Sequence, residues 1–301
     1  MNDRRTYSVS HAKGRAGFFM LLPSLIVLGV FVLYPIIHSL ILSLYNWNLL
    51  SGEQQFVGIH NFTAVFSDER FWNALRNTFY YTLLYVPGTF VSALVLALFL
   101  YRGVPGKNVF RSIFFLPAIT AMSIVALSWR FILDGDIGLI SYWLRDMNFT
   151  VTDSLRDPKT AMPTVIGVSI WKAAGFNMVI LLAGLHNIPL QYYEAADIDG
   201  ASAVRKFTSL TIPLLMPSIS FVIITNVINS FQVFDQVYVM TKGGPMFKTE
   251  TLVTYIHYKG FTLFEMGYAS AIALILFLFI MVVTIFQIRA YRKGEEEGGL
   301  A

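Results

Sequence analysis

The chain has 301 residues, of which 55% are hydrophobic and only 13% are charged, and its formal net charge is +4. Because soluble domains carry about 25% charged residues, this composition excludes a soluble globular protein and predicts an integral membrane protein. The sequence contains no cysteine, which excludes disulfides, thiolate nucleophiles and cysteine-ligated metal sites.

Six apolar segments predict six transmembrane helices, because a helix needs about 20 mostly apolar residues to cross the hydrocarbon core of a bilayer. In chain order, we place these helices near residues 17–44, 77–101, 112–133, 161–186, 214–238 and 266–290. The first segment is longer than the apolar region of a cleaved signal peptide. The chain is therefore predicted to be an all-α, polytopic membrane protein, with a transmembrane domain at 17–290 between tails at 1–16 and 291–301.

The distribution of Lys and Arg predicts the orientation, since cytoplasmic loops carry an excess of these residues. The two tails and the 102–111 and 187–213 loops together carry more basic than acidic residues. The three intervening loops carry more acidic than basic residues. Both termini and the 187–213 loop are therefore expected to be cytoplasmic.

The sequence argues against several functional classes. No predicted helix carries the series of Asp, Glu and His residues that proton-coupled pumps use, and we find no internal repeat of the kind typical of many secondary carriers. There is no Gly-rich phosphate-binding loop and no Ser-His-Asp set. The five histidines show no paired spacing and the basic residues form no stripe, so neither a metal site nor nucleic-acid binding is expected. Any transport would need energy from a partner.

The connection between the fourth and fifth segments, residues 187–213, predicts two short helices around a glycine. These helices are expected at 191–199 and 201–210, with Gly200 providing the sharp turn between them. Pro213 and Pro217 are expected to stop the second helix.

The first of these short helices has one broad face at i, i+3, i+4, i+7 spacing, formed by Tyr192, Ala195, Ala196 and Asp199. It could lie on the lipid headgroups or bind a protein. The helix has three acidic residues and no basic ones, and anionic headgroups would repel it. A protein partner is therefore favoured.

The residues of this loop resemble a known motif. Glu194-Ala195-Ala196, then Gly200 after three residues and Leu210-Thr211-Ile212-Pro213 after nine more, is similar to the EAA motif of the inner-membrane permeases of binding-protein-dependent ABC importers. The family pattern has Ile and Leu where this chain has Leu210 and Ile212, and both exchanges keep an apolar side chain. Further segments resemble the carbohydrate-importing permeases of this family: Phe56-Val57-Gly58 with Asn61-Phe62, Phe71-Trp72 with Asn77-Thr78, Trp129-Arg130-Phe131, and Met240-Thr241-Lys242-Gly243-Gly244-Pro245.

The resemblance to the maltose/oligosaccharide class implies a type I ABC importer permease architecture in a bacterial-type cytoplasmic (inner) membrane. It implies four kinds of partner: a second, different EAA-type permease, a homodimeric cytoplasmic ABC ATPase, an extracytoplasmic solute-binding protein and the carbohydrate itself. ATP and Mg would bind to the ATPase, so this chain would hold no cofactor and catalyse no reaction.

The resemblance also assigns a role to the EAA loop, as the contact that couples the permease to the ATPase. Glu194 would meet polar or basic groups of the ATPase, and Ala195 and Ala196 would pack against its surface. Gly200 would set the angle between the two short helices. The alternative is that Gly200 is an ordinary helix terminator and Glu194 a solvated charge.

A polar strip on the fifth segment is the first candidate for the substrate pathway. It recurs at i, i+3, i+4 and is continued at i+7, through Asn226, Asn229, Ser230 and Val233. Such side chains at membrane depth either line a cavity or hydrogen-bond to a neighbouring helix, and the residues alone support both equally. The resemblance to maltose-type permeases favours the sugar cavity. Phe176 and Asn177 in the fourth segment are analogous candidates, Phe176 to stack on a sugar and Asn177 to bind a hydroxyl.

Lys172 is the basic residue deep within a predicted helix, where a charge costs about 2.5–3.5 kcal/mol. It could pair with Asp235 or with a residue of the second permease, or contact an anionic substrate. It could also snorkel or bind backbone carbonyls at a helix break near Gly175. We favour the structural interpretations over a contact with substrate.

The resemblance leaves the cargo open. Sugar import is the main interpretation, and a permease of the same class for glycerol phosphate or a polyol is the alternative, because these permeases share the same motifs. A secondary carrier would need carboxylates at mid-depth as coupling-ion sites. The predicted helices have none except near the end of the fifth.

Overall fold

The computed structural model describes residue 18 and residues 20–147 and 153–297. The chain forms two compact units: one reaches to Ser67 and also contains residues 259–274, and the other contains residues 68–258 and the chain from 275 onward. Within the described residues, five helices are long and apolar enough to cross a membrane: Met20–Leu42, Glu69–Tyr101, Ala161–His186, Ala203–Phe231 and Met266–Lys293. A sixth span exists if the bent pair Lys107–Ile119 and Met122–Ile132 is counted as one. The predicted all-α membrane fold is confirmed.

The first unit begins with the helix Met20–Leu42. Among the residues that the structure describes, none in the most apolar stretch of this helix is buried. Its elements are η1 (Gly29–Leu33), α2 (Tyr34–Leu42), β1 (Tyr45–Trp47), β2 (Gln54–Phe56), α3 (His60–Phe66), η3 (Tyr258–Thr262) and the start of α14 (Met266–Glu297). β1 and β2 pair antiparallel. The buried Asn61 donates its side-chain amide to the carbonyl oxygens of Ser43 and Tyr45, at 2.8 and 2.9 Å. Asn61 therefore fastens α3 to the base of the hairpin.

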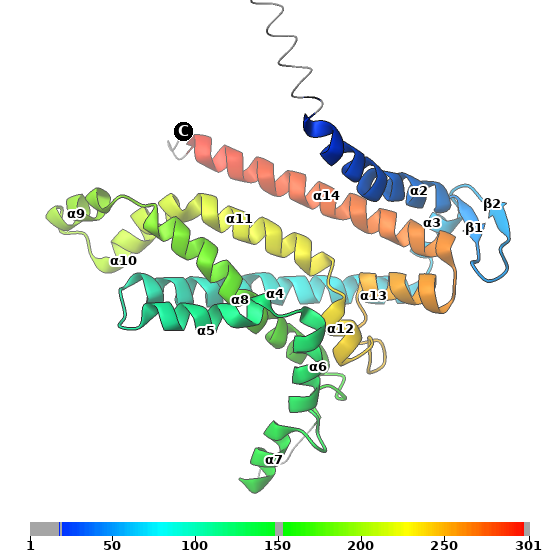
Figure 1. Cartoon of the computed structure of the whole chain (residues 1–301), viewed down its shortest axis with the longest axis horizontal. Coiled ribbons are helices and arrows are strands. Elements are labelled where there is room, and N and C mark those ends of the chain that lie inside the picture. Colours follow the sequence, from blue (N-terminus) through cyan, green and yellow to red (C-terminus); the bar gives the residue numbers. More distant parts are fainter. Residues whose placement is uncertain (1–17, 19, 148–152, 298–301) are drawn as a thin grey trace, which may run out of the picture. The chain divides into compact units, whose positions relative to one another are not determined.

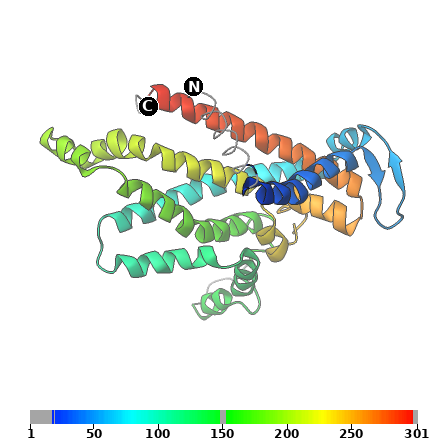
Figure 2. The same cartoon turned by 45° about the horizontal axis from the view of Figure 1, so that its top comes forward.

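The second unit contains the helices that carry the candidate site. Its elements are α4 (Glu69–Tyr101), α5 (Lys107–Ile119), α6 (Met122–Ile132), α7 (Leu139–Asp146), α8 (Ala161–His186), α9 (Leu190–Ile198), α10 (Ala203–Lys206), η2 (Phe207–Thr211), α11 (Ile212–Phe231), α12 (Asp235–Met240) and α13 (Leu252–His257). Figures 1 and 2 show α8 beside α4, α5 and α11, and the contacts between these helices agree. Small residues at the contact, such as the fully buried Ala93 and Ala97 of α4, let these helices approach closely. The fourth predicted segment, 161–186, coincides with α8.

α4 begins eight residues before the predicted start at 77. Asp68 caps it, because its carboxylate accepts a hydrogen bond from the backbone N–H of Arg70 at 2.9 Å. The predicted start was set by the first residue of an uncharged stretch. Charged residues are excluded from the part of a helix that lies in lipid, but they do not end the helix. α4 therefore extends beyond its apolar stretch, as α14 does at its C-terminal end.

The prediction of one straight helix at 112–133 is wrong. α5 ends at Ile119, α6 begins at Met122, and the two helices are bent by 98°. Thr120 and Ala121 between them have extended ψ angles of 139° and 136°. A helix with the 13 residues of α5 is about 20 Å long, which is shorter than the hydrocarbon core of about 30 Å.

The fifth segment also differs from the prediction of 214–238. α11 ends at Phe231, and Phe234 has φ −138° and ψ −64°, so the chain leaves the helix before the short α12. At the other end, α10 continues through the π-helical η2 into α11. Neither Pro213 nor Pro217 stops the helix as expected, since both lie within the helix that runs from Ala203 to Phe231. Pro213 comes just after the π-helical turn η2 (Phe207–Thr211).

Polar bonds fix the segment between α12 and α13 to the N-terminal half of α4. Arg70 donates from Nε and Nη2 to the two carboxylate oxygens of Glu250, both at 2.8 Å. Its guanidinium group lies 4.1 Å from the ring centroids of Phe247 and Tyr258. Asn77 donates to the carbonyl oxygens of Phe247 and Glu250, at 2.8 and 2.9 Å. Asn77, from one of the segments that carried the family resemblance, and the neighbouring Arg70 thus hold the chain just after the Met240–Pro245 segment by amide and bidentate hydrogen bonds.

Candidate functional site

The loop with the EAA motif forms the predicted helix-turn-helix. α9 covers residues 190–198, and Gly200 adopts φ +70°, a left-handed conformation that favours glycine. The N–H of Ala201 donates to the carbonyl oxygen of Ala196 at 2.9 Å, and the N–H of Gly200 donates to that of Asp197 at 3.1 Å. This pattern is a glycine-terminated helix end. The predicted turn at Gly200 is confirmed.

Side-chain contacts join the two short helices into one body. Lys206 of α10 forms an ion pair with Asp197 of α9 at 2.5 Å. The hydroxyl groups of Tyr193 and Thr211 lie 3.0 Å apart and connect α9 to η2. A displacement of this body would therefore be passed to α11, which continues directly from η2.

The surface of this body is largely exposed. Glu194 and Ala195 are exposed and Ala196 is half-buried. The apolar side chains of Ile198 and Val204 are 87% and 73% exposed, and our sequence interpretation did not single them out. The position of Ile198 between two aspartates was the available signal that this side chain faces outward.

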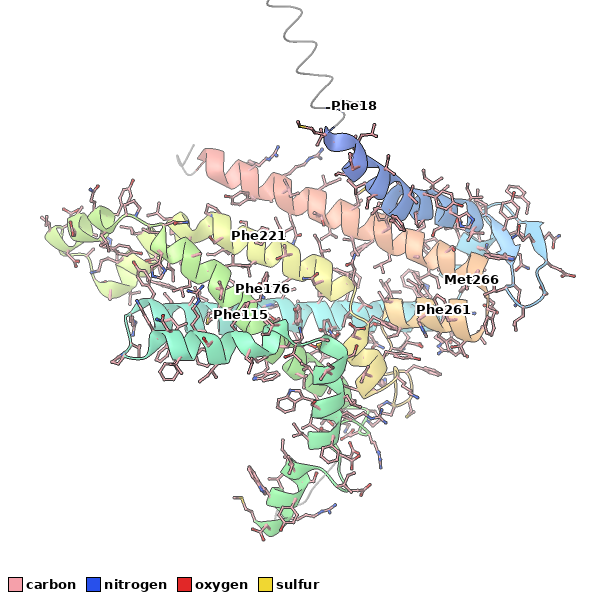
Figure 3. The ribbon with its side chains drawn as sticks, viewed as in Figure 1. Phe18, Phe115, Phe176, Phe221, Phe261 and Met266 are labelled. Carbon is pink, nitrogen blue, oxygen red and sulfur yellow. The ribbon has the colours of Figure 1, made fainter. Side chains whose placement is uncertain are left out.

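A pocket of about 470 Å³ lies between α8 and α11. It is lined by Tyr85, Ala118, Lys172, Ala173, Phe176, Asn177, Phe221, Thr225, Asn226, Ile228 and Asn229. Four of the predicted pathway residues are thus brought together: Phe176, Asn177, Asn226 and Asn229. Figure 3 labels Phe176 and Phe221 on the two helices that form it.

The two asparagines deepest in this pocket also hold the helices together. Asn226 donates its side-chain amide to Oδ1 of Asn177 at 3.0 Å and accepts a hydrogen bond from the hydroxyl of Tyr85 at 3.3 Å. Both amides are buried, with 2% and 4% of their residues' surface exposed. The strip therefore lines a cavity and also hydrogen-bonds to neighbouring helices. The same amides join α4, α8 and α11 and line the pocket.

The other members of the strip lie in different surroundings. Asn229 is exposed and lines both this pocket and an adjoining one of about 380 Å³. Ser230 is buried and donates its hydroxyl to the carbonyl oxygen of Val227, in its own helix, at 2.7 Å. Val233 lies after the end of α11, belongs to the hydrophobic core and reaches the edge of the adjoining pocket.

Lys172 lies at the junction of the two pockets. Its Nζ donates to the carbonyl oxygen of Ala118 at 3.5 Å, in the last turn of α5 beside the break between α5 and α6. Our prediction of a helix break near Gly175 is wrong, since α8 is uninterrupted there. A Cβ atom on Gly175 would lie 1.9 Å from the carbonyl oxygen of Phe114. This glycine is therefore required for the close contact of α8 with α5.

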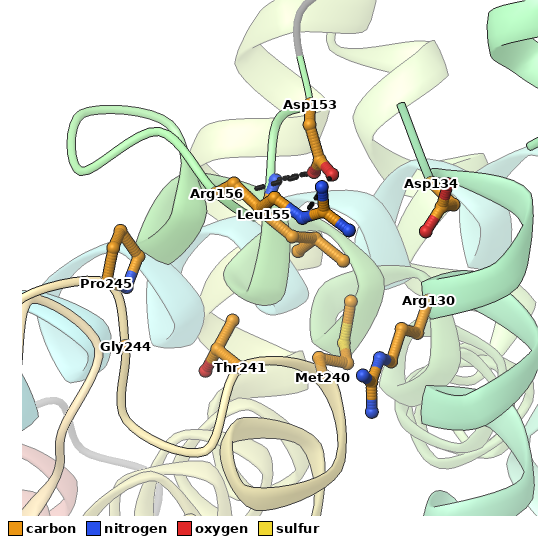
Figure 4. A pocket seen from close by; sticks show the side chains of 9 residues that line it. All are labelled: Arg130, Asp134, Asp153, Leu155, Arg156, Met240, Thr241, Gly244 and Pro245. Carbon is orange, nitrogen blue, oxygen red and sulfur yellow. Dashed lines mark hydrogen bonds and ion pairs between the residues drawn. The ribbon is translucent and has the colours of Figure 1, made fainter. Parts of the chain in front are cut away.

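A third pocket, of about 280 Å³, brings two distant motifs together (Figure 4). Arg130, from Trp129-Arg130-Phe131, donates to the carbonyl oxygen of Val239 at 3.2 Å and lies beside Met240, the first residue of the Met240–Pro245 motif. Sequence reasoning missed Asp153 and Arg156, which form an ion pair at 3.1 Å on the same pocket.

Known proteins resemble this chain in sequence and in fold. Residues 61–293 match the model of the family described as "Binding-protein-dependent transport system inner membrane component". The chain is 33% identical over 291 residues to the arabinooligosaccharides transport system permease protein AraP of Bacillus subtilis (strain 168), covering 96% of this chain and 92% of AraP. It is 32% identical over 282 residues to the sn-glycerol-3-phosphate transport system permease protein UgpA of Agrobacterium fabrum, covering 93% of this chain and 96% of UgpA.

A solved structure has the same fold. It is the bacterial alginate ABC transporter in complex with its alginate pentasaccharide-bound periplasmic protein, of which one chain matches with a TM-score of 0.83 and 24% identity, covering 94% of this chain and 96% of that one. At this identity the match shows a shared fold, and it covers nearly the whole of both chains.

Proposed function

This chain belongs to the binding-protein-dependent transport system inner membrane component family, and on that premise we propose that it is the permease of an ATP-driven sugar importer. The observation that carries the proposal is the 470 Å³ pocket between two membrane helices, where the amides of Asn177, Asn226 and Asn229 lie beside the exposed ring of Phe176. Amides bind hydroxyl groups, and an aromatic ring packs against the apolar face of a sugar.

The proposal includes the partners that the chain lacks. A second, different EAA-type permease would close the open side of the pocket, where Phe176 is 54% exposed. An extracytoplasmic solute-binding protein would deliver the sugar, and a homodimeric cytoplasmic ATPase would bind ATP and Mg. The chain would lie in the inner membrane with both termini and the 187–213 loop in the cytoplasm, and the excess of Lys and Arg on that side supports this orientation.

The geometry suggests how ATP hydrolysis would move the pocket. The body formed by α9 and α10 follows α8 in the chain and continues through η2 into α11. Both α8 and α11 line the pocket. When the ATPase subunits close or separate, this body would move with them and change the distance between α8 and α11. Rigid-body movement of this kind gives alternating access.

Uptake of labelled sugar into sealed vesicles that contain the whole importer tests the proposal. ATP is supplied on the cytoplasmic side and the solute-binding protein on the other side. We expect uptake to require both and to be unaffected when ion gradients are collapsed. Uptake that an ion gradient drives without ATP would identify a secondary carrier instead. Glycerol phosphate and a polyol, offered with their own binding proteins, test the alternative cargo.

The pathway is tested most cleanly at Asn229. Its amide makes no hydrogen bond within the described residues, so Asn229→Ala removes no contact that holds the helices. We expect sugar uptake to fall about 2–10-fold, the value of one hydrogen bond of about 0.5–1.5 kcal/mol, with unchanged assembly of the complex.

Ser230→Ala is the matched control, because Ser230 bonds only within its own helix. Its uptake should equal that of the wild type. Asn226→Leu is less informative, since it would also break the bonds to Asn177 and Tyr85. Normal uptake by Asn229→Ala would contradict the assigned pathway, and impaired uptake by Ser230→Ala would show that the other side of α11 also matters for transport.

A further inference from the structure

The ammonium group of Lys172 is incompletely satisfied. It has three N–H donors. Its hydrogen bond to the carbonyl oxygen of Ala118 has a donor–acceptor distance of 3.5 Å, whereas such bonds are usually about 2.7–3.2 Å long. Among the residues that the structure describes, Lys172 forms no ion pair within 4.0 Å. One long bond to a neutral oxygen does not compensate a charge at membrane depth.

Asp235 does not fill this role in the chain. It lines the adjoining 380 Å³ pocket together with Lys172, yet the two side chains do not approach to ion-pair distance. In the 470 Å³ pocket, Lys172 is the charged member of a lining that is otherwise apolar, amide or hydroxyl. That pocket therefore has a positive end with no acidic side chain facing it from its own lining.

The rest of this lining has the chemistry of a sugar site. Phe176 lies one turn after Lys172 on the same face of α8, and its ring is 54% exposed. Asn229 faces them from α11, exposed and with its amide available. A sugar ring against Phe176 would place a substituent within reach of the Lys172 ammonium, while Asn229 binds a hydroxyl.

We propose that the cargo is a sugar carrying an anionic group, a carboxylate or a phosphate, and that Lys172 binds this group. The inference rests on the proposed function and names the class of substrate for the same pocket. It takes the interpretation of Lys172 as a substrate contact over the structural ones, because in the described residues the ammonium lines an open pocket, has no carboxylate within 4.0 Å and makes one long bond to a backbone carbonyl. The bound anion would supply the missing charge compensation inside the membrane.

Direct binding to the complete permease–ATPase complex in nanodiscs, without the solute-binding protein, tests this inference. The probes are glucose, glucuronate and glucose 6-phosphate, measured by saturation-transfer NMR with competition. We expect one or both anionic probes to bind about 10-fold or more tightly than glucose, the effect of a hydrogen bond to a charged group. The ratio between glucuronate and glucose 6-phosphate distinguishes a carboxylate from a phosphate cargo.

Two variants separate the roles of Lys172. Lys172→Met should remove the preference for the anionic probes and leave glucose binding within about 2-fold of the wild type, while Lys172→Arg should retain the preference. Both variants must assemble like the wild type by size-exclusion chromatography, and a Lys172→Met complex that fails to assemble while Lys172→Arg assembles would overturn the inference in favour of a structural charge.

The other outcomes are also decisive. If the wild type binds glucose as tightly as both anions, or if Lys172→Met keeps the preference, the inference is wrong and the sugar pocket stands. If the wild type binds none of the three probes, the sugar pocket itself is wrong, and the proposed function fails together with the inference.

Discussion

Gly175→Val is expected to prevent α8 from packing against α5 and to lower the amount of assembled complex in the membrane. Even the first added carbon would lie 1.9 Å from the carbonyl oxygen of Phe114 and 3.1 Å from the Cα of Phe115. These are backbone atoms, so the clash is relieved only if α5 itself moves. Overpacking of this kind costs about 1–3 kcal/mol or more. The thermal midpoint of the purified complex measures the effect.

Gly167→Ala is the matched control on the same helix. A Cβ atom at Gly167 would meet nothing within 4 Å, and alanine is a better helix former than glycine by about 1 kcal/mol. This variant should therefore be as stable as the wild type or slightly more so. Equal losses in both variants would show that α8 does not tolerate a side chain at either glycine, and a stable Gly175→Val complex would contradict the close contact with α5.

Gly200→Val is expected to separate the ATPase from the permease without preventing insertion. A Cβ at Gly200 would meet nothing within 4 Å, so the glycine is needed for its φ of +70° and not to make room for a neighbour. A β-branched residue in this conformation is strongly disfavoured, at a cost of about 1–2 kcal/mol. The turn would change, and α9 would point away from its present direction.

Gly200→Asn gives the control for this variant, since asparagine tolerates the left-handed conformation. The measurement is the amount of ATPase that co-purifies with a tagged permease. We expect near-normal recovery with Gly200→Asn and a large loss with Gly200→Val. Full recovery with both variants would mean that the turn angle does not matter for ATPase binding.

The extents of two helices show what the sequence could and could not predict. The bounds of α8, 161–186, were predicted correctly, and Pro189, three residues after its end, is a local signal that the helix does not continue. The end of α11 was missed, because apolar residues continue past Phe231. No local sequence signal predicts the non-helical conformation of Phe234, with φ −138° and ψ −64°. The break between α5 and α6 was missed for the same reason, although Pro117 shortly before it is a weak signal.

The candidate site divides in the same way. The turn at Gly200 was predictable, because a single residue type determines a local backbone conformation. The surroundings of Asn229 and Ser230 were not, since these neighbours in sequence point to different sides of α11, and the rotation of a helix is set by its packing. The partner of Lys172 is the carbonyl oxygen of Ala118 on another helix, which no spacing within α8 could indicate.

The most direct test of the coupling role is ATP hydrolysis by the reconstituted importer, with and without sugar-loaded binding protein, in the wild type and in Glu194→Lys. Glu194 is exposed, and within the described residues it forms no ion pair, so its reversal should leave folding and the partner permease unaffected. In the proposed contact with the ATPase, the reversed charge would no longer pair with the group that Glu194 meets. The loss of one such charge pair at a partly buried interface typically costs about 2–5 kcal/mol of binding free energy. We predict that loaded binding protein stimulates hydrolysis in the wild type and fails to do so in Glu194→Lys. Wild-type stimulation in Glu194→Lys would contradict the assignment of this glutamate to the contact that couples ATP hydrolysis to transport.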